Sequence, residues 1–438
     1  MTSFQVRTDK EQGDAGADHL LDWFDERGAS TIAYNPAFLK GLRPSSIAVD
    51  FFRLGGAVYC ADKVVSREDQ DDFWTRSIEL QVPVSDPDVW NGAAATITKA
   101  LTFLSGDRWT VSFVADTVER QKTEREAFSD TVSLFSGGLD SLSGVIDSLE
   151  DGRWPVLVAH HDSPLTATTQ HKLLAALRGK YGDGRLTFRE LYLRPSGPRS
   201  GQARPLPGGE VENTTRCRSF LFLSAGVAVA DALGQDVTLR VPENGFIGIN
   251  VPLTPARAGS LSTRTTHPLF MSFMEQVFGT VGLPHPVENP YRLWTKGEVL
   301  DRCANRKLLL GLAPASISCS HPEAPRWAKR DQGNCGYCYP CLIRRASMHR
   351  VGADDASAYA WDALSDPDLL ARTSKRGRAL RALASSLGRP TRGDDVLRNG
   401  RIPGGEASAF FDVYKRGRDE LRAWLAGAGP ALKRRLPD

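Results

Sequence analysis

Residues 131–150 (TVSLFSGGLDSLSGVIDSLE) constrain the fold of this chain more than any other segment. The run TVSLF has the length and apolar character of a buried parallel strand. After it, apolar residues recur at helical spacing from Leu142 to Leu149. The SGGLDS turn therefore joins a strand to the N-terminus of a helix, where the first backbone amides lack partners and the helix dipole is positive.

The SGGLDS turn also has the composition of an anion site. Gly137 and Gly138 let the backbone approach a ligand without Cβ clashes, and Ser136 and Ser141 supply hydroxyl donors. The turn matches neither the G-x-x-x-x-G-K-[ST] nor the G-x-G-x-x-G pattern. We interpret it as a site for a phosphate or pyrophosphate; an ordinary tight turn is the alternative.

Position by position, the turn resembles the S-G-G-x-D-S loop of the PP-loop ATP pyrophosphatases, which split ATP between its α and β phosphates. The resemblance implies a PP-loop (adenine nucleotide α-hydrolase-like) fold and ATP as cofactor. A carboxylate beside phosphates is costly unless it helps to hold Mg²⁺, which is the expected role of Asp140. The residues implied to hold the pyrophosphate end are Ser136, Gly137, Gly138, Leu139, Asp140 and Ser141.

The whole chain has the composition of a globular protein without a membrane segment. Its 438 residues suggest about three domains, and its 41% apolar and 24% charged residues are ordinary values. The polar N-terminus lacks the apolar stretch of a secretory signal, and the longest mostly apolar run, 220–230, is too short to span a membrane. Seven cysteines, an odd number, do not fit a secreted disulfide framework. We expect a cytoplasmic enzyme.

The pattern of elements divides the chain into three predicted regions. Residues 1–125 are expected to form an N-terminal α+β accessory domain, residues 126–350 the catalytic domain, and residues 351–438 a basic helical extension. In the catalytic region strands alternate with helices, which predicts a doubly wound parallel sheet, an α/β fold. Ligands bind such sheets at the carboxyl ends of the strands, where the SGGLDS turn lies.

Within the first region, three runs look like strands and one looks like a helix. The strand-like runs are residues 46–65, 77–84 and 108–116, and the helical segment is 90–104. No catalytic constellation is recognisable among them.

Four cysteines form the second strong pattern. Cys335, Cys338 and Cys341 follow one another at three-residue steps, and Cys319 lies sixteen residues upstream. Four thiolates in this spacing can converge on one Zn²⁺ ion, within a zinc-binding segment at 313–345. The competing interpretation is an iron–sulfur cluster, because C-x-x-C-x-x-C also occurs in such proteins.

Together, the turn and the cysteines resemble the 7-cyano-7-deazaguanine synthase (QueC) family, over residues 131–350. The family pattern C-G-x-C-x-x-C-x-x-R places Arg344 last, and the helix TRCRSFLFLSAGVAVADALG is similar to the family's G-R-N helix. Other matches are QHK at 170–172 and LWTKGEVL at 293–300. By resemblance, the nucleotide-binding set gains His160, Gln170 and His171, and the catalytic set is Asp140, Lys296 and Arg218.

The chain departs from the family at the substrate end. Where the family has an Asp-Tyr and a later Asp-Cys-Arg pattern, this chain reads PENGFIGINVPLTPARAGSLSTRTTHPLF. We expect the substrate contacts to come from Ser219, Glu243, Asn244 and Arg264. With its added terminal regions, the chain is most similar in layout to the QueC-like proteins of bacterial anti-phage defence systems, such as the Qat system.

The resemblance implies ATP-dependent, AMP-forming activation of the carboxylate of a 7-deazaguanine such as 7-carboxy-7-deazaguanine. An amine then attacks and an amide forms, a C–N ligase reaction in which activation splits one difficult step into two. The expected amine belongs to a partner protein from the same defence operon. The alternative is synthesis of free 7-cyano-7-deazaguanine (preQ0) from ammonia. Transfer of sulfur to tRNA has little support, because the nearest cysteine, Cys217, lies inside the helix match.

The C-terminal region is strongly basic. From residue 371 onward there are 16 Lys or Arg against 7 Asp or Glu. A solvated helix surface is one explanation, and a docking surface for an acidic protein or for nucleic acid is the other. A non-catalytic, nucleic-acid-binding defence subunit is therefore the competing function, although an intact SGGLDS turn argues against it.

Overall fold

The computed structural model describes most of the chain: residues 1–9, 12–13, 15–23, 31–116, 129–161, 163–196, 212, 214, 216–252, 264–331, 333–371 and 373–428. These residues form an α/β structure with two sheets and fourteen α-helices. None of the described helices combines the length and the apolar character needed to cross a membrane.

The strands divide into a small and a large sheet. The small sheet has the order β2-β1-β4-β5, and the large sheet has the order β10-β9-β6-β7-β8-β3. The strands are β1 (Thr2–Arg7), β2 (His19–Asp22), β3 (Ile32–Tyr34), β4 (Ser77–Val84), β5 (Arg108–Ala115), β6 (Thr131–Leu134), β7 (Val156–His161), β8 (Thr187–Pro195), β9 (Thr238–Arg240) and β10 (Val287–Glu288).

The helices follow in chain order. They are α1 (Ser46–Val64), α2 (Pro87–Ser105), α3 (Leu139–Glu150), α4 (Pro164–Tyr181), α5 (Arg218–Leu233), α6 (Gly245–Ile249), α7 (Pro268–Val281), α8 (Lys296–Arg302), α9 (Arg306–Leu312), α10 (Ala324–Trp327), α11 (Tyr339–Arg350), α12 (Pro367–Leu370), α13 (Arg378–Leu387) and α14 (Ala407–Ala426). Short 3-10 helices lie at Pro36–Leu39, Asp183–Arg185, Ala313–Ala315, Ala356–Ala358, Gly393–Leu397 and Pro403–Gly405.

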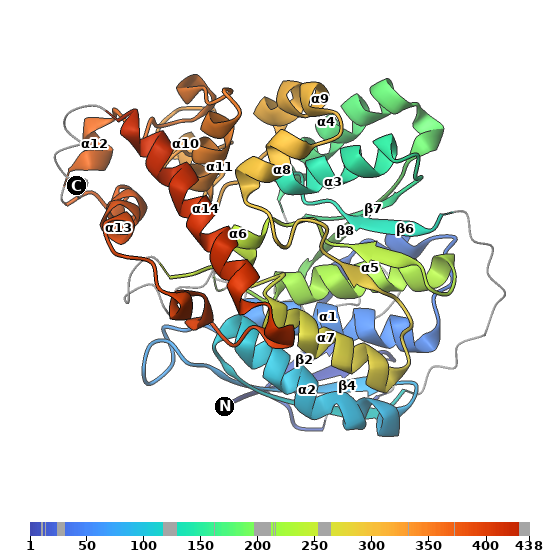
Figure 1. The fold of residues 1–438 in the computed structure, drawn as a ribbon. Helices are drawn as coiled ribbons and strands as arrows, with labels where there is room; N and C mark the ends of the chain where they lie inside the picture. The colour runs from blue at the N-terminus through green and yellow to red at the C-terminus, as the bar shows by residue number, and fades with distance from the viewer. Residues whose placement is uncertain are drawn as a thin grey trace.

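The large sheet is parallel except for β3, which pairs antiparallel with β8. Among its parallel strands β6 comes first in the chain and lies between β7 and β9, so the chain extends the parallel part of the sheet first to one side of β6 and then to the other. Helices α3 and α4 contact β6 and β7, while α5 lies toward the small sheet (Figure 1). The predicted alternation of strands and helices in this region is confirmed. The turn that follows β6 lies at the switch point of the sheet, where α/β proteins bind ligands.

The small sheet corrects the expectation of an α+β arrangement for residues 1–125. All of its strand pairs are parallel, and α2 connects β4 to β5. In β5, buried and more exposed residues alternate, because the described helices cover one face of this sheet. Such alternation is typical of antiparallel sheets, so the sequence pattern was misleading.

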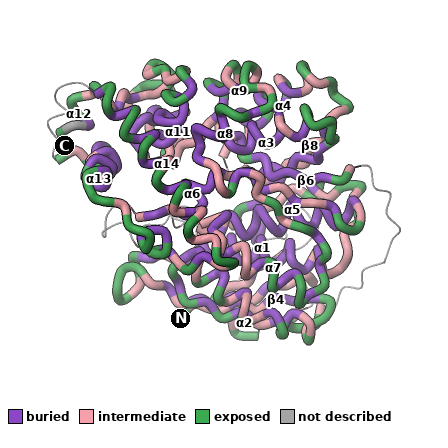
Figure 2. The backbone as a smooth tube through the Cα atoms, in the orientation of Figure 1, coloured by how far each residue is buried: buried purple, intermediate pink, exposed green. Residues whose placement is uncertain are grey.

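The prediction of a strand at 46–65 is wrong, because these residues form α1. Ser45 caps the helix by accepting a hydrogen bond from the amide of Ala48. Helix α1 packs against α5 and also contacts β4 and β8, so it is buried on nearly all sides (Figure 2). A helix without a solvent-exposed face shows no 3.6-residue alternation of polar and apolar residues, and its β-branched and aromatic residues imitate a strand.

Two apolar cores cross the region boundaries predicted at 125 and 350. One buried cluster includes residues of α1 and α2 together with β6 and α5. A second joins three of the four cysteines to Trp361, Leu380 and apolar residues of α14. In Figure 1 the long helix α14, in red, crosses beside α6 and α11. The basic C-terminal region therefore supplies core residues as well as surface.

Candidate functional site

The SGGLDS turn joins β6 to α3, as its sequence predicts. Gly137 has a φ of +84°, a conformation that L side chains rarely adopt, so glycine is required there. Gly138 is the N-cap residue of α3, and no side chain caps the helix at this position. The first amide of α3, that of Leu139, donates to Oγ of Ser318, whereas the amides of Asp140 and Ser141 have no acceptor among the described residues and remain available to an anion.

Two hydroxyl groups lie beside these amides. The Oγ atoms of Ser136 and Ser141 are 3.1 Å apart, and Ser141 donates to the carbonyl of Gly138 at 3.0 Å. Ser136 is exposed, whereas Ser141 is buried. The structure thus brings the predicted loop residues together in an arrangement that can bind a phosphate.

Gln170 supports the turn from α4. Its side-chain amide donates to the carbonyls of Phe135, Ser136 and His160 at 3.3–3.4 Å. Because its amide links the ends of β6 and β7, Gln170 shapes the backbone of the turn.

The two histidines predicted to bind the nucleotide, His160 and His171, differ in their burial and in the residues that they contact. His160 is fully buried and accepts a hydrogen bond at Nδ1 from Nε of Arg218 at 3.1 Å. Arg218 also donates to the His160 carbonyl at 2.8 Å, so it joins α5 to the end of β7. His171 is exposed and contacts Glu190 at 2.9 Å instead of the turn.

Asp140 and Lys296 form the charged centre of the site. Nζ of Lys296 donates to Oδ1 of Asp140 at 2.6 Å, and the side-chain amide of Asn244 donates to Oδ2 at 2.7 Å. Only 4% of the Lys296 side chain and 11% of the Asp140 side chain are exposed. Removal of either partner of such a buried pair is strongly destabilising, because it leaves an unpaired buried charge. Asn244, which we expected to contact substrate, thus anchors Asp140.

Glu243 is a second carboxyl group at this site. Burial raises its pKa to about 7, and the nearby charge of Asp140 acts in the same direction. The hydroxyl of Thr266 donates to it at 2.5 Å and acts in the opposite direction, as does Lys296. Near neutral pH, Glu243 can therefore exchange a proton, which suits a group facing an amine or a carboxylate.

The raised pKa of Glu243 predicts a pH-dependent stability. Between pH 4.5 and 7 the folded chain holds a proton on Glu243 that the unfolded chain releases, so this contribution is full below pH 4.5 and falls as the pH rises to 7. We expect Glu243→Gln to remove it. The difference in unfolding free energy between the variant and the wild type should therefore change in favour of the variant as the pH rises from 5 to 8. This change should be at most about 3 kcal/mol, measured by urea denaturation. The exposed Glu68→Gln is the control; equal pH dependence in all three proteins would contradict the assignment.

The remaining predicted substrate residues do not gather at the turn. Ser219, in the first turn of α5, donates to the carbonyl of Arg216, which precedes the helix, at 3.3 Å. Arg264 lies over the ring of Phe103 in α2, with its guanidinium carbon 4.4 Å from the ring centre. Burial, and secondarily the charge of Arg216, lowers its pKa to about 10.

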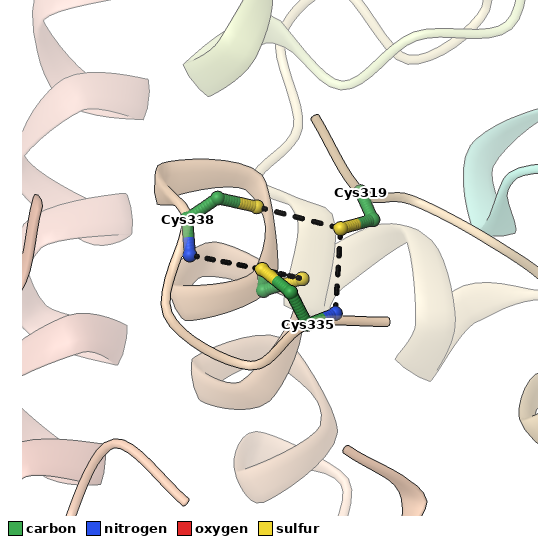
Figure 3. A group of neighbouring side chains, drawn as sticks. Cys319, Cys335 and Cys338 are labelled. Carbon is green, nitrogen blue, oxygen red and sulfur yellow. Dashed lines mark hydrogen bonds between the residues drawn. The ribbon is translucent and has the colours of Figure 1, made fainter. Parts of the chain in front are cut away.

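The prediction that the four cysteines converge is confirmed. Their sulfur atoms all lie within 4.8 Å of one another. Figure 3 shows Cys319, Cys335 and Cys338 with their sulfur atoms directed toward a common centre. Backbone amides of Cys335 and Cys338 donate to sulfur at 3.3 and 3.4 Å, which stabilises thiolates. Gly336 makes the turn possible, because a Cβ there would lie 2.0 Å from the carbonyl oxygen of Trp361.

The sulfur spacing fits a single metal ion such as zinc. The Cys319–Cys338 and Cys335–Cys341 sulfur pairs are 3.8 and 3.9 Å apart. Four sulfurs at about 2.3 Å from a tetrahedral zinc lie about 3.8 Å from one another. In a [4Fe–4S] cluster each cysteine sulfur would bind a different iron, and in a [2Fe–2S] cluster the four sulfurs would be divided between two irons, so both clusters require a wider spacing than the 4.8 Å found here.

Hydrogen bonds connect the cysteine segment to the SGGLDS turn. The amide of Ile317 donates to the carbonyl of Gly137 at 3.1 Å, and the amide of Leu139 donates to Oγ of Ser318 at 3.3 Å. Asn334 accepts from the amide of Ser318 at 3.1 Å and donates to the carbonyl of Ser316 at 3.0 Å. Arg344, the last residue of the family pattern, also holds this segment, through Oγ of Ser316 at 2.9 Å.

Our sequence reasoning missed Ser318 and Asn334. A signal was present, because each immediately precedes a ligand cysteine and both are turn-forming polar residues. Cys217, in contrast, is fully buried, and burial raises the pKa of its thiol far above the usual value. A buried thiol of this kind is not an activated nucleophile.

Comparison of the chain with protein-family models, with curated proteins and with solved structures finds no match.

Proposed function

We propose that this chain is a QueC-like, AMP-forming ligase that uses ATP to activate the carboxylate of a 7-deazaguanine, such as 7-carboxy-7-deazaguanine, and joins it to an amine. One observation supports this most. The N-terminus of α3, whose N-cap Gly138 has no side chain and whose second and third amides are unpaired among the described residues, is flanked by Ser136 and Ser141 and lies at the switch point of a parallel sheet, beside the Lys296–Asp140 pair.

The residues of the turn match the demands of a leaving pyrophosphate. Its negative charge would meet the amides that begin α3 and the hydroxyl of Ser136, at the positive end of the helix dipole. These donors are part of the folded backbone, so they need no rearrangement as charge develops. ATP supplies an electrophilic α-phosphorus and, after pyrophosphate has left, an AMP leaving group on the substrate carboxylate.

Lys296 would neutralise charge on the α-phosphate. Its ammonium group is buried and is held in place by Asp140, which Asn244 holds in turn. A cation in such a water-poor environment acts more strongly than one on the surface. Asp140 has lone pairs beyond the two used here, so we retain it as the expected ligand of Mg²⁺.

Glu243 is suited to the amine step. The attacking amine must lose a proton when it forms the amide, and a carboxylate with a pKa of about 7 can accept it. We propose that the amine belongs to a partner protein of an anti-phage defence system. Synthesis of free preQ0 from ammonia is the alternative. The two reactions differ in their product, which is a modified protein in the first case and a free small molecule in the second.

The test is product analysis with the full-length protein, ATP, Mg²⁺ and 7-carboxy-7-deazaguanine. We expect AMP and pyrophosphate, and a loss of activity of about 10²-fold or more in Asp140→Asn. That variant leaves Lys296 unpaired, so Ser136→Ala, which preserves the pair, is a second probe with an expected loss of about tenfold. Asp151→Asn, an exposed change at the end of α3, should leave activity unchanged.

Each other outcome has a definite meaning. ADP as product would show that the cleavage position is wrong. Salt-dependent binding of tRNA or DNA without ATP consumption would favour the non-catalytic subunit. Efficient formation of preQ0 from ammonia, with no mass added to a co-expressed operon protein, would favour the plain synthase.

A further inference from the structure

A cavity lies between the small sheet, the first half of α1 and residues 34–40, and none of its described lining residues belongs to the SGGLDS turn. Its volume is about 550 Å³, within the range of small-molecule sites. Thr8 and Trp23, which directly follow β1 and β2, line it together with Tyr34, Phe52 and Arg53. In residues 1–125 the sequence alone shows no recognisable catalytic constellation.

The position of the cavity in the sheet is one that binds ligands in other α/β proteins. In the order β2-β1-β4-β5, the chain extends the sheet from β1 to β2 on one side and later to β4 and β5 on the other. The carboxyl end of β1 is thus the switch point of this parallel sheet.

Aromatic rings form one wall of the cavity. The ring of Trp23 lies 5.2 Å from that of Tyr34 and 5.5 Å from that of Phe52, and Phe38 extends this group through Phe52 at 5.4 Å. Trp23 and Tyr34 are only partly buried, so their rings are accessible from the cavity. Such a wall favours a flat, aromatic ligand.

Arg53 provides the polar end. It is 5% exposed, and its interactions with Pro83, Asp50 and Asp116 all involve Nη1, at 2.5, 3.5 and 2.9 Å. Among the residues that the structure describes, neither Nε nor Nη2 of Arg53 has an acceptor. A buried guanidinium with two adjacent free donors is equipped for a ligand that presents two adjacent acceptors.

The charges around Arg53 decide between an anion and a neutral ligand. Asp50 and Asp116 already compensate the guanidinium, and the exposed Lys40 lies at the rim. Both carboxylates would repel the negative charge of a phosphate bound to Arg53, whereas a neutral ring edge carries no charge for them to repel. We infer that this cavity binds a nucleobase of the guanine class, stacked on Trp23, with its O6 and N7 acceptors facing Arg53. Arg recognises this edge of guanine bidentately.

The two sites lie toward opposite ends of α1. Asp62, nine residues after Arg53, accepts a hydrogen bond from the amide of Cys217 at the start of α5, on the side of the SGGLDS turn. At 1.5 Å per residue, Arg53 and Asp62 are about 14 Å apart along the helix. Base binding at the cavity can therefore be tested with variants that do not touch the SGGLDS turn.

The test uses guanosine and adenosine as probes in calorimetric titrations of the full-length protein, with saturating ATP and Mg²⁺ present. Guanosine presents two acceptors to Arg53, whereas adenosine presents one acceptor and one donor, so we expect guanosine to bind about tenfold more tightly or better. Trp23→Leu should weaken guanosine binding about tenfold or more through lost stacking. Trp154→Leu, a change of an exposed tryptophan elsewhere, should not affect it.

Arg53→Lys should abolish the preference for guanosine, because lysine lacks the planar pair of donors. Since this change also disturbs Asp50 and Asp116, Trp23→Leu remains the decisive variant if Arg53→Lys unfolds. Ser136→Ala should bind guanosine as the wild type does, whether or not the ligase reaction is confirmed. Absence of guanosine binding, equal binding of adenosine, or unchanged binding in Trp23→Leu would overturn the inference.

Discussion

A Cys338→Ser variant should lose its bound metal and with it the folded structure around the cysteines. Wild-type protein should contain one zinc per chain, whereas the variant should contain almost none. Cys338 is 3% exposed, is the N-cap residue of α11, and belongs to the same apolar core as Trp361 and Trp424. Structural zinc sites contribute roughly 10–16 kcal/mol of apparent binding energy, as much as the whole stability of a typical domain.

Metal content by mass spectrometry and thermal unfolding by circular dichroism check this result. Cys303→Ser is the matched control, because Cys303 is equally buried but lies outside the cysteine cluster. It should keep its zinc and lose only about 1–2 kcal/mol of unfolding free energy. A Cys338→Ser protein that retains stoichiometric metal, or a wild type with the visible absorbance of iron, would show that the assignment is wrong.

The loss of metal should also destabilise the SGGLDS turn. Ser318 immediately precedes Cys319 and accepts the hydrogen bond of the Leu139 amide, and Ile317 donates to Gly137. In Cys338→Ser the amides of Leu139 and Ile317 should therefore exchange hydrogen faster, while those of β1 and β4 should not. Unchanged exchange at Leu139 would mean that the turn holds its shape without the cysteine segment.

Deletion of residues 407–438, a segment that begins with α14, should abolish ATP-to-AMP conversion as well as any transfer to a partner. Glu420 accepts hydrogen bonds from Thr295 and from the amide of Gly297, at the N-terminus of the helix that begins with Lys296. Arg416 bonds to Glu298 of the same helix at 2.7 Å. Without these contacts, the helix that positions Lys296 loses its support.

A point variant separates this effect from simple truncation. A Cβ at Gly417 would lie 2.2 Å from the ring of Phe246, so Gly417→Ala should force α14 away from α6 and cost about 2 kcal/mol or more. Lys415→Ala is the control, because its ion pair with Asp412 is on the surface and contributes little. Thermal unfolding and AMP formation are the measurements. Normal AMP formation by the deletion protein would restore the view of this region as a separable docking surface.

That view is one of the two alternatives that the sequence left open, and the packing of α14 argues against a separable region for a physical reason. The surplus of Lys and Arg after residue 371 describes the outer faces of the helices and says nothing about the inner ones. In the structure, Phe410, Leu421 and Trp424 pack into the core of the cysteine segment. Composition records how many charges a segment has, whereas packing depends on which faces meet.

The sequence by itself determined the features that depend on neighbouring residues. A short apolar strand, a Gly-Gly turn and a helical repeat can be recognised within twenty residues, and three of the four cysteines lie within seven. Backbone propensity and short spacings decide such structures locally, so β6, α3 and the cysteine cluster could be predicted.

Only the tertiary structure decided what distant segments do to one another. Lys296 and Asp140 are 156 residues apart in sequence, and Asn244 and Glu420 come from further segments. Their meeting depends on the order of the strands and the packing of whole helices. Helix α1, which the sequence led us to predict as a strand, has the same explanation. A helix buried between two sheets has no polar face, so its sequence lacks the helical repeat of polar and apolar residues, and it can be recognised only once its neighbours are known.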